Sequence, residues 1–254
     1  MTIEASAVAA NELILDARGI TKRFGGFVAL NNVDLAVRPG ERLGLIGPNG
    51  SGKSTLTNCL CGALKTDGGS ITFAGRAIDN LSSYQRARLG LGRSFQLPRP
   101  FHSLSLLDNL RIPLVYAVNA RGGTHLTEQQ IRARSTDLLG EFGLGGKLHR
   151  LPGDLTQVEM RKLELARAMA TDPTLLVSDE ALAGLSHSEV NEILALLLAL
   201  NKRGVAVIFI EHIMRAVMAF SERLVVLVAG EKIADGAPKD VIADERVIGA
   251  YLGQ

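Results

Sequence analysis

Nine consecutive residues have the types and spacing that suit binding of a polyphosphate. The segment is Gly47-Pro48-Asn49-Gly50-Ser51-Gly52-Lys53-Ser54-Thr55, and it fits the pattern G-x-x-x-x-G-K-[ST] between an apolar run at 43–46 and an apolar segment at 56–60. Glycines let the backbone form a concave loop with inward N–H groups, and a following helix adds unpaired N–H donors. We expect Lys53 to contact the β- and γ-phosphates and the Ser54 hydroxyl to ligate Mg²⁺. An ordinary glycine-rich turn is the alternative, and the full match in frame disfavours it.

Two adjacent carboxylates follow a second apolar run, 175–178. Open α/β sheets bind their ligands at the carboxyl ends of strands, which is where Asp179 and Glu180 would lie. Neighbouring strand residues point to different sides, so the two acids can do different work. We expect Asp179 to bind Mg²⁺ through water and Glu180 to activate the attacking water. A solvated strand end is the alternative.

Three further residues are candidates for the same site. Gln96 ends a strand-like stretch and could reach a metal-bound water or a phosphate, although a solvated loop amide is the simpler local explanation. His212 follows the apolar run 205–210 and could hydrogen-bond a γ-phosphate or lie on the surface as an ordinary imidazole. Phe24 lies beside Gly25 and could stack on a base or pack in the core.

The elements that must position these residues alternate between strand and helix. Short strands are expected from Leu13 to Ile46, separated by turns at Gly19, Gly25-Gly26, Asn31-Asn32 and Pro39-Gly40. They should form an antiparallel sheet that leads into the strand before the phosphate loop. The helix opened by Lys53 should end near Gly62. Ser186 and Glu189 form a capping box for a later helix, and residues 224–234 read as a hairpin.

The block from Ser105 to about Asp172 has helical periodicity and interrupts this alternation. Ser105 with Asp108, and Thr127 with Gln130, resemble helix starts. Pro113 should interrupt a helix. The sequence therefore predicts one domain over residues 1–254, with a β/α core at 13–96 and 173–254 and a helical insertion at about 97–172.

Bulk properties set limits on the class of protein. The chain has 254 residues, 46% of them hydrophobic, and a net charge of +2, so charge gives no indication of a nucleic-acid partner, and we expect none. The two cysteines, Cys59 and Cys61, are expected to be reduced, packed thiols. The N-terminus does not resemble a secretory signal, and the longest apolar run, 193–200, is far below the about 20 residues of a spanning helix.

In this order, these motifs resemble the ATP-binding subunits of ABC transporters over nearly the whole chain. Residues 47–55 are similar to the Walker A loop, 93–96 to the Q-loop segment and 175–180 to Walker B with its catalytic glutamate. His212 matches the switch histidine, and Phe24 matches the adenine-stacking aromatic residue. The D-loop would be Ala183, Gly184, Leu185 and Ser186.

The resemblance implies a fold, cofactors and partners. The expected fold is an α/β P-loop NTPase with a RecA-like core, an N-terminal antiparallel β subdomain and an inserted helical subdomain, and the expected cofactors are ATP and Mg²⁺. Segments 94–100, 181–185 and 235–253 look most like those of branched-chain amino acid importers. Such a subunit is peripheral at the cytoplasmic face of the membrane, dimerises head to tail and drives two permeases supplied by a solute-binding protein.

One motif departs from the family pattern. Where the family usually has Leu-Ser-Gly-Gly-Gln, this chain has Leu155, Thr156, Gln157, Val158 and Glu159. In the family this motif presents N–H groups to the γ-phosphate of the opposite subunit's ATP, so Gln157 and Val158 add bulk there. Glu159 adds a charge whose repulsion could reach about 4 kcal/mol at about 4 Å and an effective dielectric of about 20. We therefore expect a heterodimer with two unequal sites.

Three alternatives remain open from the sequence. Export of lipopolysaccharide or another lipid is one, because its ATPases resemble the same group. A soluble ABC-type ATPase acting on nucleic acid or translation is a second, although such proteins usually carry two domains, coiled coils or metal-binding insertions. The altered signature also keeps open a regulatory protein that binds ATP without turning it over.

Overall fold

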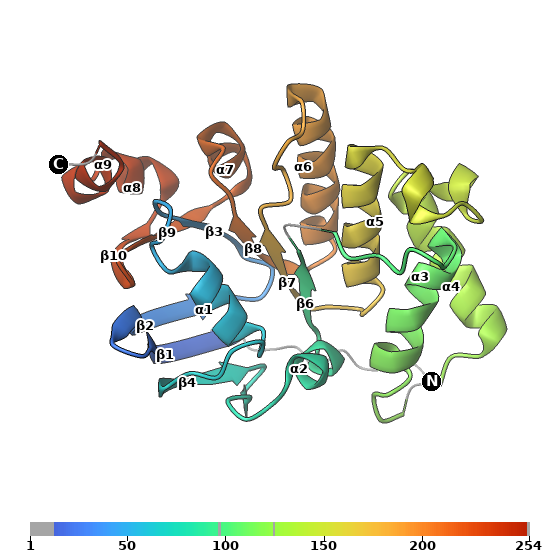
Figure 1. Cartoon of the computed structure of the whole chain (residues 1–254), viewed down its shortest axis with the longest axis horizontal. Helices are drawn as coiled ribbons and strands as arrows, with labels where there is room; N and C mark the ends of the chain where they lie inside the picture. The colour runs from blue at the N-terminus through green and yellow to red at the C-terminus, as the bar shows by residue number, and fades with distance from the viewer. Residues whose placement is uncertain (1–12, 96–97, 124, 253–254) are drawn as a thin grey trace.

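The central element is a six-stranded, mostly parallel sheet (Figure 1). The computed structural model describes residues 13–95, 98–123 and 125–252. The strand order is β10-β9-β3-β8-β7-β6, and only β10 runs antiparallel to its neighbour within these ranges. The bounds are β3 Arg42–Ile46, β6 Leu91–Ser94, β7 Leu175–Asp179, β8 Ala206–Ile210, β9 Arg223–Val228 and β10 Glu231–Gly236.

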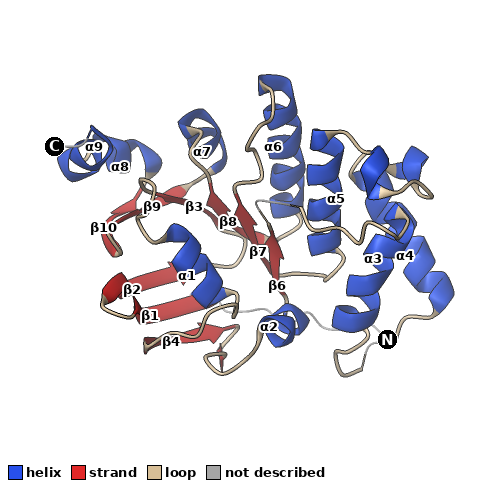
Figure 2. Ribbon diagram, in the orientation of Figure 1, coloured by secondary structure: helices blue, strands red, loops and turns tan. Residues whose placement is uncertain are grey.

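Helices cover both faces of this sheet (Figure 2). One face carries α5 (Gln157–Met169), α6 (His187–Lys202) and α7 (Met214–Phe220), and the other carries α1 (Lys53–Leu60). Side chains alternate along the buried strands, so Leu176 and Val207 belong to the first core while Val177 and Ile208 belong to the second. Burial on both faces explains why the strands read as continuous apolar runs.

A second, antiparallel sheet packs on the far side of α1, with strand order β2-β1-β4-β5. Its bounds are β1 Leu15–Phe24, β2 Phe27–Val37, β4 Gly68–Phe73 and β5 Arg76–Ala77. The sequence predicted short strands with turns at Gly19 and Asn31-Asn32, and this was wrong in detail. Gly19 (φ 62°) and Asn32 (φ 53°) lie inside two long strands near register shifts, where bulges take up the positive φ angles.

Most expected helix starts are confirmed. The hydroxyls of Ser105 and Thr127 accept hydrogen bonds from the third residue of their helices, and Ser186 with Glu189 forms a capping box. The α-helical pattern ends at Pro113, and a π-helical stretch follows directly, in which the Asn119 N–H donates to the Leu114 carbonyl. The elements of this region are α3 Leu106–Pro113, η1 Leu114–Val118, α4 Glu128–Glu141, η2 Gly145–Lys147 and η3 Pro152–Asp154.

Three helices complete the described chain: α2 Ser83–Leu89, α8 Pro238–Ala243 and α9 Glu245–Leu252. The sequence did not predict α2, whose start is a capping box of Ser82 and Gln85. Cys59 and Cys61 are buried free thiols, as expected, and burial raises the pKa of Cys61 to about 12. Among the described residues, every helix is too short or too polar to cross a bilayer.

Candidate functional site

The phosphate loop connects the end of β3 to the start of α1. Gly47 has φ 153°, and a Cβ there would overlap the carbonyl oxygen of Leu227. Gly52, at φ 103°, is the N-cap of α1, and its added Cβ would lie 2.8 Å from the Ala29 carbonyl oxygen. Two positions in the loop therefore require glycine, one for close backbone approach and one for the turn into the helix.

Lys53 lies across this loop. Its Nζ donates to the carbonyl oxygens of Gly47, at 2.7 Å, and Pro48, at 3.0 Å. Partial burial lowers the pKa of Lys53, and the charges of Glu180 and Asp179 act against that shift. The ammonium group is thus held at the loop, within electrostatic reach of both predicted acidic residues. Asn49, Gly50 and Ser51 precede Lys53 in the loop, and Ser54 and Thr55 follow it in the first turn of α1.

Other elements form the walls of the loop. The turn between β9 and β10 contributes Gly230, whose N–H donates to the Ser51 carbonyl at 3.0 Å. Gly230 also accepts from Asn31 N–H of β2, which ties the antiparallel sheet to the loop. From α9, Tyr251 reaches the loop, where burial raises the pKa of its hydroxyl and the Gly47 N–H acts against that rise. The sequence did not predict this contact between the C-terminal segment and the loop.

Phe24 lies at the tip of the β1–β2 hairpin and is 49% exposed. The Nζ of Lys22 lies 5.6 Å from its ring centroid. A half-exposed ring on the sheet that borders the loop is available for stacking. The adenine-stacking role stays a prediction.

Asp179 ends β7 and is buried, with an ion-pair partner that sequence reasoning missed. Arg93 of β6 donates from Nη2 to Asp179 Oδ2 at 2.8 Å and from Nη1 to Asn58 Oδ1 at 2.8 Å. The only sequence signal was that Arg93 lies in a strand directly before Gln96. The hydroxyl of Ser54 and the carboxylate of Asp179 are hard oxygen donors of the kind that Mg²⁺ prefers, so the donor set fits a magnesium-bound nucleotide.

Glu180 and His212 follow neighbouring strands, β7 and β8. Glu180 has φ 47°, unusual for a residue other than glycine, and its N–H donates to the Ile210 carbonyl at 2.9 Å. The side chain of His212 is 67% exposed. The structure thus brings both predicted residues to one edge of the sheet. Gln96, the third candidate for this edge, lies outside the described residues.

The signature segment, residues 155–159, opens α5. Thr156 is the N-cap, and its hydroxyl accepts from the N–H of Glu159. The Glu159 carboxylate accepts from Lys147 Nζ at 2.7 Å and from Thr156 N–H at 3.0 Å, and these bonds lower its pKa. The sequence-based expectation of strong repulsion from Glu159 therefore needs correction, because a lysine and the end of its own helix already balance this charge.

The side chain of Gln157 is turned toward the predicted D-loop of the same chain. Its Nε2 donates to the Ala183 carbonyl at 3.3 Å, and a Cβ at Gly184 (φ 78°) would overlap it. Val158 is partly buried and packs against the hydrophobic core, as do Leu155 and Leu185. Ser186, the last residue of the predicted D-loop, caps α6.

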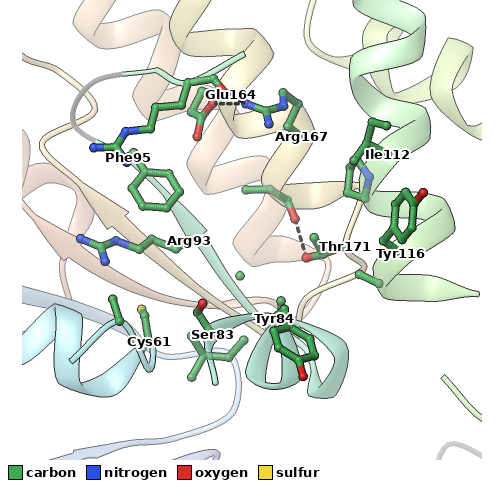
Figure 3. A pocket seen from close by; sticks show the side chains of 18 of the residues that line it. Cys61, Ser83, Tyr84, Arg93, Phe95, Ile112, Tyr116, Glu164, Arg167 and Thr171 are labelled. Atoms are coloured by element: carbon green, nitrogen blue, oxygen red, sulfur yellow. Dashed lines mark hydrogen bonds and ion pairs between the residues drawn. The ribbon is translucent and has the colours of Figure 1, made fainter. Parts of the chain in front are cut away.

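A pocket of about 550 Å³ lies beside Arg93, between α2, β6, α3 and α5. In Figure 3, Arg93 and Phe95 lie on one side of it and Ile112 and Tyr116 on the other. The guanidinium of Arg93 also lies 4.9 Å from the Phe95 ring centroid. Arg93 therefore connects the wall of this pocket to Asp179.

A parallel sheet with a glycine-rich loop after β3, a lysine at the helix start and two acids at the carboxyl end of β7 defines a P-loop nucleotide-binding protein. A family model described as ABC transporter matches residues 30–183, and one described as branched-chain amino acid ATP-binding cassette transporter matches residues 231–254. The chain belongs to the ATP-binding subunits of ABC transporters, which are ATPases. The expected P-loop NTPase fold is confirmed.

Two relatives of known type show which kind of ABC transporter subunit this chain resembles. The chain is 37% identical to the high-affinity branched-chain amino acid transport ATP-binding protein LivG of Salmonella typhimurium, with 95% of this chain and 98% of that protein covered. It is 36% identical to BraF of Pseudomonas aeruginosa, described in the same words, over the same shares. Among solved structures, an ATP-binding cassette of an ABC transporter in its ADP conformation has TM-score 0.84 and 31% identity, covering 96% of this chain and 100% of that one.

Proposed function

We propose that this chain powers uptake of branched-chain amino acids or related small solutes, as the ATPase of an importer. The main support for ATP hydrolysis is that Lys53, in the phosphate loop, interacts electrostatically with Asp179 and Glu180 at one edge of the sheet. The solute class rests on the similarity to LivG and BraF and on the C-terminal family match.

Each site residue has a proposed role. The loop N–H groups and Lys53 bind the β- and γ-phosphates of magnesium-bound ATP, and Phe24 stacks on adenine. Ser54, Asp179 and Gln96 would hold Mg²⁺, which would neutralise charge on the phosphates. Glu180 accepts a proton from the attacking water, and His212 contacts the γ-phosphate. Arg93 holds the Asp179 carboxylate in a fixed orientation.

The partners are proposed as two permeases, a solute-binding protein that acts through them, and a second ATP-binding subunit. The assembly would hold this chain peripherally at the cytoplasmic face of the membrane. Four exposed aromatic residues line the pocket beside Arg93: Tyr84, Phe95, Phe101 and Tyr116. Exposed aromatic surface of this kind suits a protein partner, so we propose it for a permease. We treat residues 97–172 as the helical insertion, which contributes Phe101 and Tyr116 to this aromatic surface.

The second ATP-binding subunit is proposed to differ from this chain. The support is that Gln157 and Val158 stand where the family has glycines, so the backbone at the helix start carries Cβ atoms there. It is not the charge of Glu159, which Lys147 balances. The chain's own loop, Asp179 and Glu180 would act on ATP against the partner's signature. The partner's ATP would face residues 155–159 and turn over slowly.

The test is turnover and uptake by the transporter complex isolated through a tag on this chain. Glu180→Gln should reduce ATP turnover by about 100-fold or more while leaving ATP binding intact, because it removes only the base. Leucine uptake into vesicles should fall with it. Exposed Glu245→Gln is the matched control. Full turnover in Glu180→Gln would contradict the assigned role, and copurification without permeases would contradict the transport assignment.

A further inference from the structure

The segment directly after Glu180, residues 181–185, is held by side chains from two other elements. The N–H of Leu182 donates to Oε1 of Glu211, at the end of β8, over 2.8 Å in a buried setting. The Ala183 carbonyl accepts from Gln157 Nε2 and from Arg161 Nη2 of α5, each at 3.3 Å. The strand before His212 and the signature helix therefore both contact this segment.

Glu211 is an unusual residue to find at this position. Its side chain has no exposed surface, and Oε2 makes no hydrogen bond to any part of the chain that the structure describes. That oxygen lies 4.0 Å from Nδ1 of His212. Buried polar atoms normally have partners, so a half-satisfied carboxyl beside two predicted site residues calls for an explanation.

The last residue of β8 and the residue after it anchor the turn at Glu180 and again two residues later. The Ile210 carbonyl accepts the N–H of Glu180 itself, and the neighbouring Glu211 carboxyl accepts the N–H of Leu182. Glu180 keeps its positive φ between these two anchors. A residue in that conformation persists only where its surroundings hold it.

We propose that Glu211 is a positioning residue for ATP hydrolysis, which holds Leu182 and thereby the turn that presents Glu180. The inference rests on the proposed role of Glu180 as the base. It assigns Glu211 no contact with ATP or with the attacking water.

The charge of Glu211 makes this anchor sensitive to pH. Burial raises the pKa of Glu211 to about 7, and the Glu180 charge adds to the rise. Arg161 of α5 and the amides of Leu182 and His212 act in the opposite direction. Glu211 is thus neutral below about pH 7 and ionised above it. An ionised carboxylate is the stronger acceptor for Leu182, so the anchor tightens as pH rises.

Amide hydrogen exchange of the full-length chain tests the contact without using activity. Glu211→Ala should speed exchange in residues 181–185 by about tenfold, because Leu182 loses its acceptor. Glu211→Gln keeps a carbonyl oxygen, so its exchange in this segment should stay within about threefold of the native chain. Unchanged exchange in α6 shows that each variant is folded. Native-like exchange of residues 181–185 in Glu211→Ala would overturn the proposal.

Kinetics of the isolated transporter complex test the consequence. Native kcat should rise by about threefold as pH passes 7, and Glu211→Gln should lack that rise while its KM for ATP stays near native. Glu245→Gln should keep the native profile. If the native and Glu211→Gln complexes have the same pH profile of kcat, and Glu180→Gln is still inactive, the inference about Glu211 is overturned. Full activity of Glu180→Gln would instead overturn the proposed function.

Discussion

The buried carboxyl of Glu211 links stability to pH. Its pKa is raised from 4.5 to about 7 in the folded chain, so the folded state holds this proton more tightly than the unfolded state. The free energy of unfolding should therefore fall as pH rises from about 4.5 to about 7, and then level off above that range. The full effect of such a shift is about 3 kcal/mol.

Glu211→Gln should remove this dependence because an amide does not titrate. We expect the variant to gain stability relative to the native chain at pH 8, and to match it more closely at pH 5. Urea unfolding followed by circular dichroism at both pH values is the measurement, with Glu245→Gln as control. An equal stability difference between variant and native chain at the two pH values would contradict the raised pKa.

At the scale of elements, the sequence predicted most of the structural features that depend only on neighbouring residues. The strand and helix around Lys53, the strand that ends in Asp179, the helix start at Thr127 and the capping box at Ser186 were predicted from adjacent residues. Glycine positions in the loop were recognised for the same reason. Each of these signals lies within a few residues of the element that it defines.

Contacts between distant elements could not be predicted in this way. Arg93 and Asp179 lie 86 residues apart, and Glu211 and Leu182 lie 29 apart, so only the strand order β8-β7-β6 brings them together. The bent strands β1 and β2 were misjudged because Gly19 and Asn32 form bulges as readily as turns. Gln157 was expected to project bulk toward a partner, yet its side chain contacts Ala183.

At the scale of the whole molecule, the altered signature should decide how the chain dimerises. We expect the purified chain to stay monomeric with magnesium and ATP, because Gln157 and Val158 carry a Cβ at the helix start, where the family's glycines leave room for the partner's phosphates. Restoring glycine at both positions should permit an ATP-dependent homodimer. Light scattering is the measurement, with glycine substitution at exposed Gln129 as control. A native homodimer with two equally fast sites would contradict the heterodimer proposal.

All of these proposals depend on binding of a nucleoside triphosphate by the loop at residues 47–55. Titration calorimetry of the native chain with magnesium and ATP measures this directly. We predict a clear binding heat, and an affinity lowered by about 30-fold or more in Lys53→Ala, because one charged hydrogen-bond donor to phosphate is lost. Exposed Lys65→Ala should bind like the native chain. Absence of heat for the native chain, or equal affinity for Lys53→Ala, would contradict the account.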